Sequence, residues 1–382
     1  MNNNKTTAMN TLPVITFRWL RVNDISLNLS YEYKDFPYST DYLKTKLLGD
    51  DIVIQNRKDS IADIKNIEAL IKEKLEAVPS QKDYEVNEEL RKECETAYNA
   101  GIYVHVPKGR KVEDPIHLEY TLNHDHPSLV DHHLIVAEAN AKITIIVDYS
   151  TTDTTSAYHN GIMKVVAKEG SQVTIIKIQR MNDSSHHFDS NYAYVEDHAS
   201  VNYIQIELGG KHSVTSFRSD IKEASEATID SVYFGDGDRL IDLNYKMNHL
   251  GRRSISNIQT KGALKDKAIK TFRGTLDFKT GASRSEGCEE EYVILFDKEV
   301  TSNSIPLLLC GEDDVKGQHA ASAGKMDSEK LFYMMSRGFA REEAMKMIVE
   351  ASFQPILGKV PDENLREIVG KEIHRRLMNE KL

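Results

Sequence analysis

Hydrophobic and polar positions divide the chain into three stretches that follow different periods. In the first 95 residues, the clearest pattern is a set of apolar positions spaced by three and four residues, which is one face of a helix. These positions are Ile61, Ile64, Ile67, Ile71 and Leu75. Asp59-Ser60 can cap such a helix and Pro79 would stop it, so the pattern predicts a helix over residues 61–77 within a mixed segment.

The middle stretch, from Ile102 to Leu309, has the pattern of β-structure. Short runs rich in Val, Ile, Thr and Tyr alternate there with breaks of Gly, Asn, Asp and Ser. No helical period persists through this stretch, which predicts an all-β core.

Part of this core repeats. The third residues of five similar blocks are 30, 28, 26 and 28 residues apart. They are Ile143, Val173, Val201, Ala227 and Ile255. Such a period is typical of stacked β units, none of which can bury its apolar face alone. We therefore expect a parallel β-helix; the loose alternation leaves a β-sandwich or a jelly roll as alternatives.

After Met326 the pattern becomes helical. Asp327 can cap a first helix that ends near Gly338, where a left-handed residue is expected. A second helix is predicted from Arg341 to Ser352, and a third is predicted to start at Pro361. The third helix carries an apolar stripe, formed by Leu365, Ile368, Val369, Ile373 and Leu377. This stripe needs a surface to cover it, either the β core or a partner protein.

These shifts of pattern predict three units. Residues 1–95 form a mixed or helical N-terminal domain, residues 96–325 the β-helix core, and residues 326–382 a C-terminal helical domain.

Composition narrows the classes of protein to which the chain can belong. Charged residues make up 28% and hydrophobic residues 40%, which is the composition of an ordinary soluble protein. The net charge is −10, and Lys and Arg are dispersed among acidic residues, which disfavours nucleic-acid binding. The longest apolar runs, 292–296 and 305–310, are much shorter than the roughly 20 residues of a membrane span. The N-terminus shows no apolar leader, which disfavours export. Three scattered cysteines disfavour a disulfide framework or a structural zinc site. Both observations lead us to expect a cytoplasmic protein.

Histidines and cysteines are the first candidates for chemistry. His124, His126, His132 and His133 lie close together, and His186-His187 follow later. Consecutive strand residues point to opposite faces, so His132 and His133 cannot easily share a metal, and we interpret these histidines as members of solvated loops. We interpret Cys310 as a small buried hydrophobe, with a ligand role as the alternative. Acidic neighbours disfavour a thiolate at Cys94 and Cys288.

His319 has a different context. It lies in a run of small residues, 317–324, at the junction of the β core and the helical tail. Small neighbours leave an imidazole accessible, and imidazole is a good ligand for iron. The alternative is a histidine that caps the last strand.

Motifs of an enzyme are missing from the sequence. It contains no GxxxxGK[ST] loop, no strand–GxGxxG–helix unit and no GxSxG elbow. Paired carboxylates such as those of 289–291 are interpreted as solvated acid runs. A β-helix polysaccharide lyase or hydrolase therefore has no support from motifs.

Residues 313–344 resemble the closing segment of the SufB/SufD family. Weaker similarity is carried by residues 99–109 with 115–118, by 158–161, and by 242–249 with 254–256. The resemblance implies a right-handed parallel β-helix between helical end domains, in a protein that helps the SufC ATPase to assemble iron–sulfur clusters.

The resemblance also implies partners and site residues. A SufB-like chain would pair through the β-helices, and the C-terminal helices would dock a SufC-like ATPase. We place that docking region at Phe332, Tyr333, Ser336, Arg337 and Gly338. His319 matches the SufD histidine at the interface with SufB, which is thought to help hold a nascent cluster together with a SufB cysteine. The implied cluster is transient, and no cofactor is held permanently.

Several departures favour the SufD branch over the SufB branch. Alignment on Pro306 and His319 places Val300 where SufB-like chains have a cysteine, and 301–303 where they have Gly-Ala-His. Ala320 stands where they have Glu after the histidine. Gly317 replaces a cysteine often found in SufD chains, so thiolate ligands should come mainly from the partner. We therefore expect a SufD-type scaffold that is not an enzyme; the alternatives are a SufB-like paralogue and a structural β-helix homodimer without a cluster role.

Overall fold

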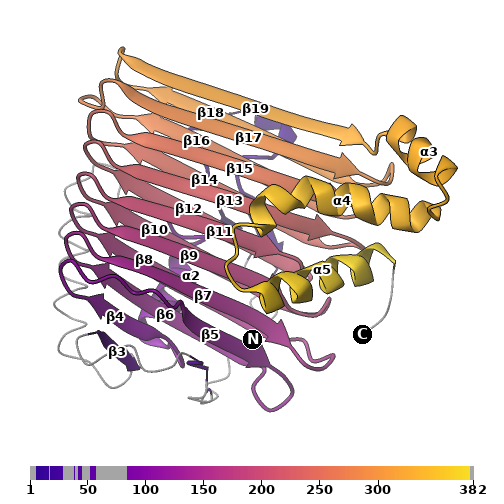
Figure 1. Cartoon of the computed structure of the whole chain (residues 1–382), viewed down its shortest axis with the longest axis horizontal. Coiled ribbons are helices and arrows are strands. Elements are labelled where there is room, and N and C mark those ends of the chain that lie inside the picture. The colour runs from indigo at the N-terminus through magenta and orange to yellow at the C-terminus, as the bar shows by residue number, and fades with distance from the viewer. Residues whose placement is uncertain are drawn as a thin grey trace.

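The computed structural model describes residues 6–16, 18–28, 38, 42–44, 52–56 and 84–378. The predicted helix over 61–77 lies outside these residues. Most of the described chain forms two large sheets that face each other along a single column (Figure 1).

The nine-stranded sheet contains the even-numbered strands of the column and β3. In spatial order it consists of β3 (Val53–Asn56), β4 (Ile102–Val106), β6 (Ser128–Ala137), β8 (Tyr158–Ala167), β10 (His186–Val195), β12 (His212–Ile221), β14 (Leu240–His249), β16 (Ile269–Phe278) and β18 (Thr301–Cys310). All neighbours pair in parallel except β3 and β4, which are antiparallel.

The eight-stranded sheet contains the odd-numbered strands, and all of its pairs are parallel. In spatial order it consists of β5 (Ile116–Leu122), β7 (Lys142–Thr151), β9 (Gln172–Arg180), β11 (Ser200–Glu207), β13 (Glu226–Gly235), β15 (Ile255–Leu264), β17 (Ser285–Leu295) and β19 (Val315–Lys325). Consecutive strands alternate between the two sheets, so each pair forms one coil of a parallel β-helix. The predicted β-helix is thus confirmed, and the sandwich and jelly-roll alternatives, which require antiparallel sheets, are wrong.

A recurring corner leads the chain from the nine-stranded to the eight-stranded sheet at the six passages into β7, β9, β11, β13, β15 and β17. A residue with positive φ is followed by a small buried residue, and the strand begins at or directly after that small residue. These corners are Asn140-Ala141, Gly170-Ser171, His198-Ala199, Ala224-Ser225, Arg253-Ser254 and Arg284-Ser285. The left-handed residue reverses the chain direction within a few residues, and the small side chain lets successive corners stack.

The sequence repeat matches the coils except at its last member. Ile143, Val173, Val201 and Ala227 are in register with one another and point into the core. Ala227 is paired with Ser256, however, and Ile255 is 49% exposed, so the predicted alignment of Ile255 is wrong by one residue. The segment between β14 and β15 is one residue longer than that between β12 and β13, and a shift of one residue exchanges the two faces of a strand.

N-terminal elements cover the outer face of the nine-stranded sheet. Strands β1 (Thr6–Met9) and β2 (Ile25–Asn28) form an antiparallel pair, and a short 3-10 helix, η1 (Arg18–Leu20), lies between them. Helix α2 (Glu88–Thr96) is capped by the Asn87 side chain and buries Leu90 and Cys94 against β6 and β8.

Three C-terminal helices follow the last strand: α3 (Ser328–Ser336), α4 (Arg341–Leu357) and α5 (Glu363–Leu377). Asp327 caps α3, and Gly338 has a φ of 98°, as predicted. Helix α4 is longer than predicted because it continues through Pro355, and α5 begins after the cap residue Asp362 rather than at Pro361. Within the described residues, no helix has both the length and the apolar character that a membrane span needs.

Helices α4 and α5 lie against the outer face of the eight-stranded sheet, whereas α3 projects beyond the end of β19 (Figure 1). The predicted stripe of α5 is buried, with Ile368 partly buried, in a cluster that contains Ile204, Ile206 and Val232 of the sheet. The β core itself, and not a partner, therefore covers this stripe.

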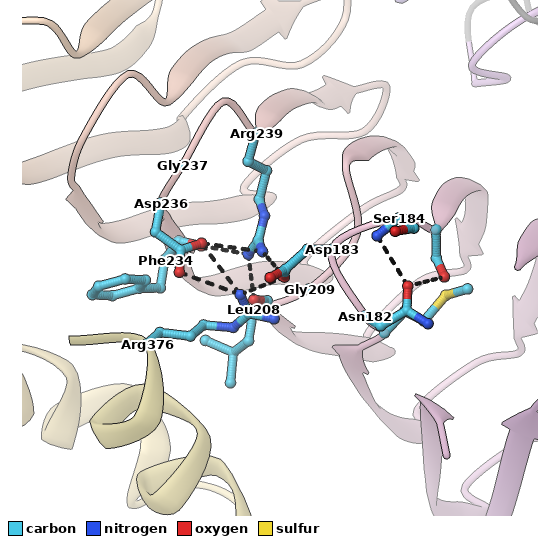
Figure 2. A network of polar contacts seen from close by, with 12 residues as sticks. Asn182, Asp183, Ser184, Leu208, Gly209, Phe234, Asp236, Gly237, Arg239 and Arg376 are labelled. Carbon is cyan, nitrogen blue, oxygen red and sulfur yellow. Dashed lines mark hydrogen bonds and ion pairs between the residues drawn. The ribbon is translucent and has the colours of Figure 1, made fainter. Parts of the chain in front are cut away.

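A polar network fastens the end of α5 to the β-helix. Figure 2 shows Arg239 and Arg376 converging on Asp183 and Asp236. Arg376 Nη1 lies 3.0 Å from Asp183 Oδ1 and 3.2 Å from Asp236 Oδ1, and Arg239 Nη2 lies 2.7 Å and 3.1 Å from the same two oxygens. Burial and the neighbouring Arg376 lower the pKa of Arg239 to about 10. The two arginines tolerate each other because the two carboxylates lie between them.

Candidate functional site

The last coil leaves one end of the β-helix open. Strands β18 and β19 are the outermost strands of their sheets, and within the described residues no further strand pairs with either of them (Figure 1). Both are long, with 10 and 11 residues. An unpaired strand edge presents a row of N–H and C=O groups that can pair with another chain.

His319 lies in the middle of β19, so the alternative interpretation of a histidine that caps the last strand is wrong. It is paired in register with Glu289 of β17, and Glu289 points into the β-helix. Paired residues of neighbouring strands lie on the same face of a sheet, so His319 belongs to the inner row as well. The last coil has nothing stacked on it in the described chain, and the His319 side chain is exposed.

The carboxylates of 289–291 are not a solvated acid run, which corrects the prediction. Glu290 is exposed, but Glu289 and Glu291 alternate with it and are only 2% and 3% exposed inside the coil. Glu291 is well compensated. Its Oε1 lies 2.7 Å from Lys270 Nζ and accepts a 2.9 Å hydrogen bond from the Tyr233 hydroxyl, and its Oε2 accepts one from Ser304 Oγ.

Glu289 differs from Glu291. Its Oε2 is buried and has no hydrogen-bond partner among the described residues. Burial, together with the charge of Glu291, raises the pKa of Glu289 to about 8. The carboxyl group fits only because Gly274 of β16 faces it, since a Cβ at Gly274 would lie 2.2 Å from the carboxyl carbon. Sequence reasoning missed Glu289; the alternation of Gly287, Glu289, Glu291 and Val293 along one face was the signal that could have found it.

The three cysteines lie apart. Cys310 is exposed at the end of β18, so its interpretation as a buried hydrophobe is wrong. Burial raises the pKa of Cys94, and burial followed by the charges of Glu290 and Glu289 raises the pKa of Cys288. Both shifts disfavour a thiolate, as the sequence predicted.

Three of the clustered histidines, His132, His133 and His187, are buried on strands, so the prediction of solvated loops is wrong for them. A fourth buried histidine, His159, which the sequence analysis did not name, lies beside His187, and all four are 0% exposed. His159 Nδ1 lies 2.7 Å from His187 Nδ1, and His159 Nε2 lies 3.0 Å from Asp131 Oδ2. Burial and His159 hold the pKa of His187 well below its usual value, so that ring is neutral in the core.

His132 and His133 point to opposite faces of β6, as predicted. The Ile102 backbone N–H donates to His133 Nδ1 within the β-helix, whereas the His132 ring lies edge-on to Tyr98 on the outer side. In the part of the chain that the structure describes, no three His, Cys, Asp or Glu side chains converge in a way that could hold a metal ion. An iron-containing ligand at His319 would therefore need further ligands from another molecule.

The projecting α3, the turn that follows it and the first two turns of α4 carry exposed apolar side chains, which we call the helical apolar patch. Its members are Phe332, Tyr333, Met335, Phe339 and Met347, with exposures of 73%, 58%, 41%, 41% and 42%. The Arg337 guanidinium lies over the Tyr333 ring at 5.1 Å, and Ser336 Oγ donates to Tyr333 O. Gly338 adopts its left-handed conformation directly after these residues. The five residues predicted to dock a partner thus lie together at the outer tip of the molecule.

Comparisons with known proteins agree on one family. A family model described as "SUF system FeS cluster assembly, SufBD core domain" matches residues 120–352, more than half of the chain. The chain is 26% identical over 284 residues to the iron-sulfur cluster assembly protein SufD of Bacillus subtilis, covering 73% of this chain and 64% of that protein. It is also 26% identical over 269 residues to SufB of the same organism, covering 70% and 58%.

An iron-sulfur cluster assembly SufBD family protein of Staphylococcus haemolyticus is 24% identical over 268 residues, covering 70% of this chain and 58% of that protein. The matches thus span about three fifths of the length of these relatives.

Proposed function

Since this chain belongs to the SufBD core domain family of the SUF iron–sulfur cluster assembly system, we propose that it is a SufD-type scaffold subunit, without turnover of its own, in a cytoplasmic complex with a SufB-like chain and a SufC-like ATPase. In this role it holds a nascent iron–sulfur cluster only transiently. The observation that carries the proposal is the exposed imidazole of His319 on the inner row of an uncovered last coil.

The SufB-like chain is proposed to stack its own last coil on β18 and β19. Two long, uncovered strand edges favour such pairing because each can extend its sheet into the second chain. His319 then lies at the seam, where thiolate ligands from the partner can reach the same cluster. Iron clusters prefer thiolates and accept histidine as an occasional replacement, so one imidazole suits a site that must release its cargo.

The SufD branch is supported by the absence of SufB features around the seam. SufB-like chains carry a cysteine at the position of Val300, the Gly-Ala-His motif at positions 301–303, and a Glu at the position of Ala320; this chain has none of these residues there. Identity to SufD and to SufB of Bacillus subtilis is the same, 26%, so the assignment rests on these positions.

The SufC-like ATPase is proposed to dock on the helical apolar patch. Exposed aromatic side chains at a projecting tip are typical of a protein interface, where a few such residues supply most of the binding energy. Helices α4 and α5 connect this tip to the β-helix, and the Arg376 network fixes their far end. We therefore expect nucleotide-driven motion of the ATPase to be transmitted to the β-helix as a rigid-body movement of these helices.

Co-expression with tagged SufB-like and SufC-like chains tests the ATPase contact. Phe332→Ser should weaken capture of the ATPase about tenfold or more while leaving the SufB-like chain bound. Because Phe332 is 73% exposed, the melting temperature of the isolated chain should not change. Lys330→Ala on the same helix is the matched control and should bind the ATPase normally. Full capture by the Phe332→Ser chain would contradict the docking site.

A further inference from the structure

Glu289 has a buried carboxyl group that does not stabilise the fold. A carboxylate taken out of water is unfavourable unless it is paired, and the neighbouring Glu291 has Lys270, Tyr233 and Ser304 for this. Glu289 has no such set, and its Oε2 is unpartnered among the described residues. Packing alone would be served better by an apolar side chain at this position.

The fold nevertheless makes room for this group. Gly274 lies opposite, and any side chain there would collide with the Glu289 carboxyl carbon at 2.2 Å. A glycine in the interior of a strand weakens the strand, so its presence here serves the close approach of the carboxyl group. The inner row thus has a prepared position for a carboxyl group directly beneath the last coil.

The position of Glu289 relative to His319 indicates what the carboxyl group is for. The two residues are register partners on adjacent strands, with both side chains in the inner row. Adjacent strands are about 4.8 Å apart, and two donor atoms on one metal ion are separated by about 3 Å, a difference that the Glu and His side-chain torsions can accommodate.

We propose that Glu289 and His319 together form a two-residue iron(II) site at the open end of the β-helix, with the carboxylate and the imidazole as ligands. This inference rests on the proposed function, because it gives the cargo iron a second contact in this chain. Imidazole with carboxylate is a common ligand set for iron(II), and two protein ligands leave the remaining coordination positions for the partner chain, sulfide or water.

Binding proceeds without redox chemistry. As an oxygen of the Glu289 carboxyl group bonds to the metal, any proton on that group passes to solvent, and His319 binds through the lone pair of a ring nitrogen. The incoming cation then supplies the opposite charge that Glu289 lacks within the chain. Loss of the metal returns the proton, so the site holds and releases its cargo without rearranging the fold.

Cobalt(II) binding to the full-length chain tests the site, with the visible absorption of the bound ion as the readout. Cobalt(II) is a spectroscopic substitute for iron(II) with similar ligand preferences. Glu289→Gln keeps the shape of the side chain but removes the anionic oxygen, and we expect affinity to fall at least about tenfold. Glu290→Gln, one residue along the same strand and facing outward, is the control and should bind as the wild type does. Unchanged melting temperatures would show that each variant is folded.

The outcomes separate this inference from the proposed function. Comparable losses in Glu289→Gln and His319→Ala support the two-residue site. Wild-type affinity in Glu289→Gln with a loss in His319→Ala overturns the role of Glu289 and leaves His319 as a lone ligand. Wild-type affinity in both variants overturns the role of His319 as well. A wild-type chain that binds no cobalt(II) overturns the two-residue site.

Discussion

At the scale of single residues, the packing inside the coil formed by β16 and β17 depends on the fit between one glycine and one buried carboxyl group. Gly274 and the Glu289 carboxyl group occupy complementary volumes across the interior of one coil. Protein interiors have the density of crystals, so a single added methyl group is felt where no gap exists. The two positions should therefore behave as a coupled pair.

Gly274→Ala should destabilise the chain by about 2 kcal/mol, because the new Cβ overlaps the Glu289 carboxyl group. In a Glu289→Ala background the same change should cost less than about 0.5 kcal/mol, since the overlapping atoms are gone. Urea unfolding of the four chains measures this coupling. Gly324→Ala is the control, because a Cβ at Gly324 meets nothing within 4 Å. An equal loss from Gly274→Ala in both backgrounds would contradict the proposed fit.

For single residues, the sequence predicted correctly on which face of a strand a side chain lies, but it did not predict which polar side chains are buried. His132 and His133 lie on opposite faces of their strand because neighbouring side chains alternate. Charged and imidazole groups, however, are usually exposed, and that tendency misled the interpretation of Glu289, Glu291 and the buried histidines. Their burial depends on partners such as Tyr233 for Glu291 and Asp131 for His159, which the fold brings in from other coils.

At the scale of elements, the coil corners set the register of the β-helix. A left-handed residue followed by a small buried residue occurs at the start of each strand of the eight-stranded sheet from β7 to β17, but not at the start of β19. The sequence repeat predicted stacked β units because these corners recur at nearly constant spacing. It placed Ile255 one residue out of register because apolar character was used for the alignment; Ser254, which corresponds to Ser225 at the corner, gives the correct register.

The ends of a helix were predicted correctly where capping residues determine them. Asp327 and Gly338 delimit α3 through local hydrogen bonds and backbone conformation, which are visible in the sequence. Helix α4 continues through Pro355 because the tertiary packing of Phe353, Ile356 and Leu357 against the sheet outweighs the loss of one backbone hydrogen bond.

Arg376→Ala tests how α5 is fastened to the β-helix. Arg376 is 2% exposed and its guanidinium contacts Asp183, Asp236 and Glu372, so its removal should destabilise the chain by about 3 kcal/mol. Limited proteolysis should then cut within α5 faster than in the wild type. Lys371→Ala, on the exposed side of the same helix, should change neither result. Wild-type stability of Arg376→Ala would show that apolar packing alone holds the helix.

At the scale of the whole molecule, the β-helix is a rigid column that is covered along its sides and open at one end. The N-terminal elements and α2 cover one sheet, and α4 and α5 cover the other. The open end presents His319 and two strand edges, and the projecting α3 presents the helical apolar patch. These are two separate surfaces, as the proposed scaffold between a SufB-like chain and a SufC-like ATPase would require.

The iron and sulfide content of the anaerobically purified three-component complex tests the central claim most directly. The account predicts that a complex built with His319→Ala has the same composition as the wild-type complex, because His319 is exposed and, among the described residues, makes no contact on which the fold depends. Its bound iron and sulfide should fall about tenfold, because the seam has lost its imidazole ligand. A complex with His319→Ala that carries as much iron and sulfide as the wild type would contradict the account.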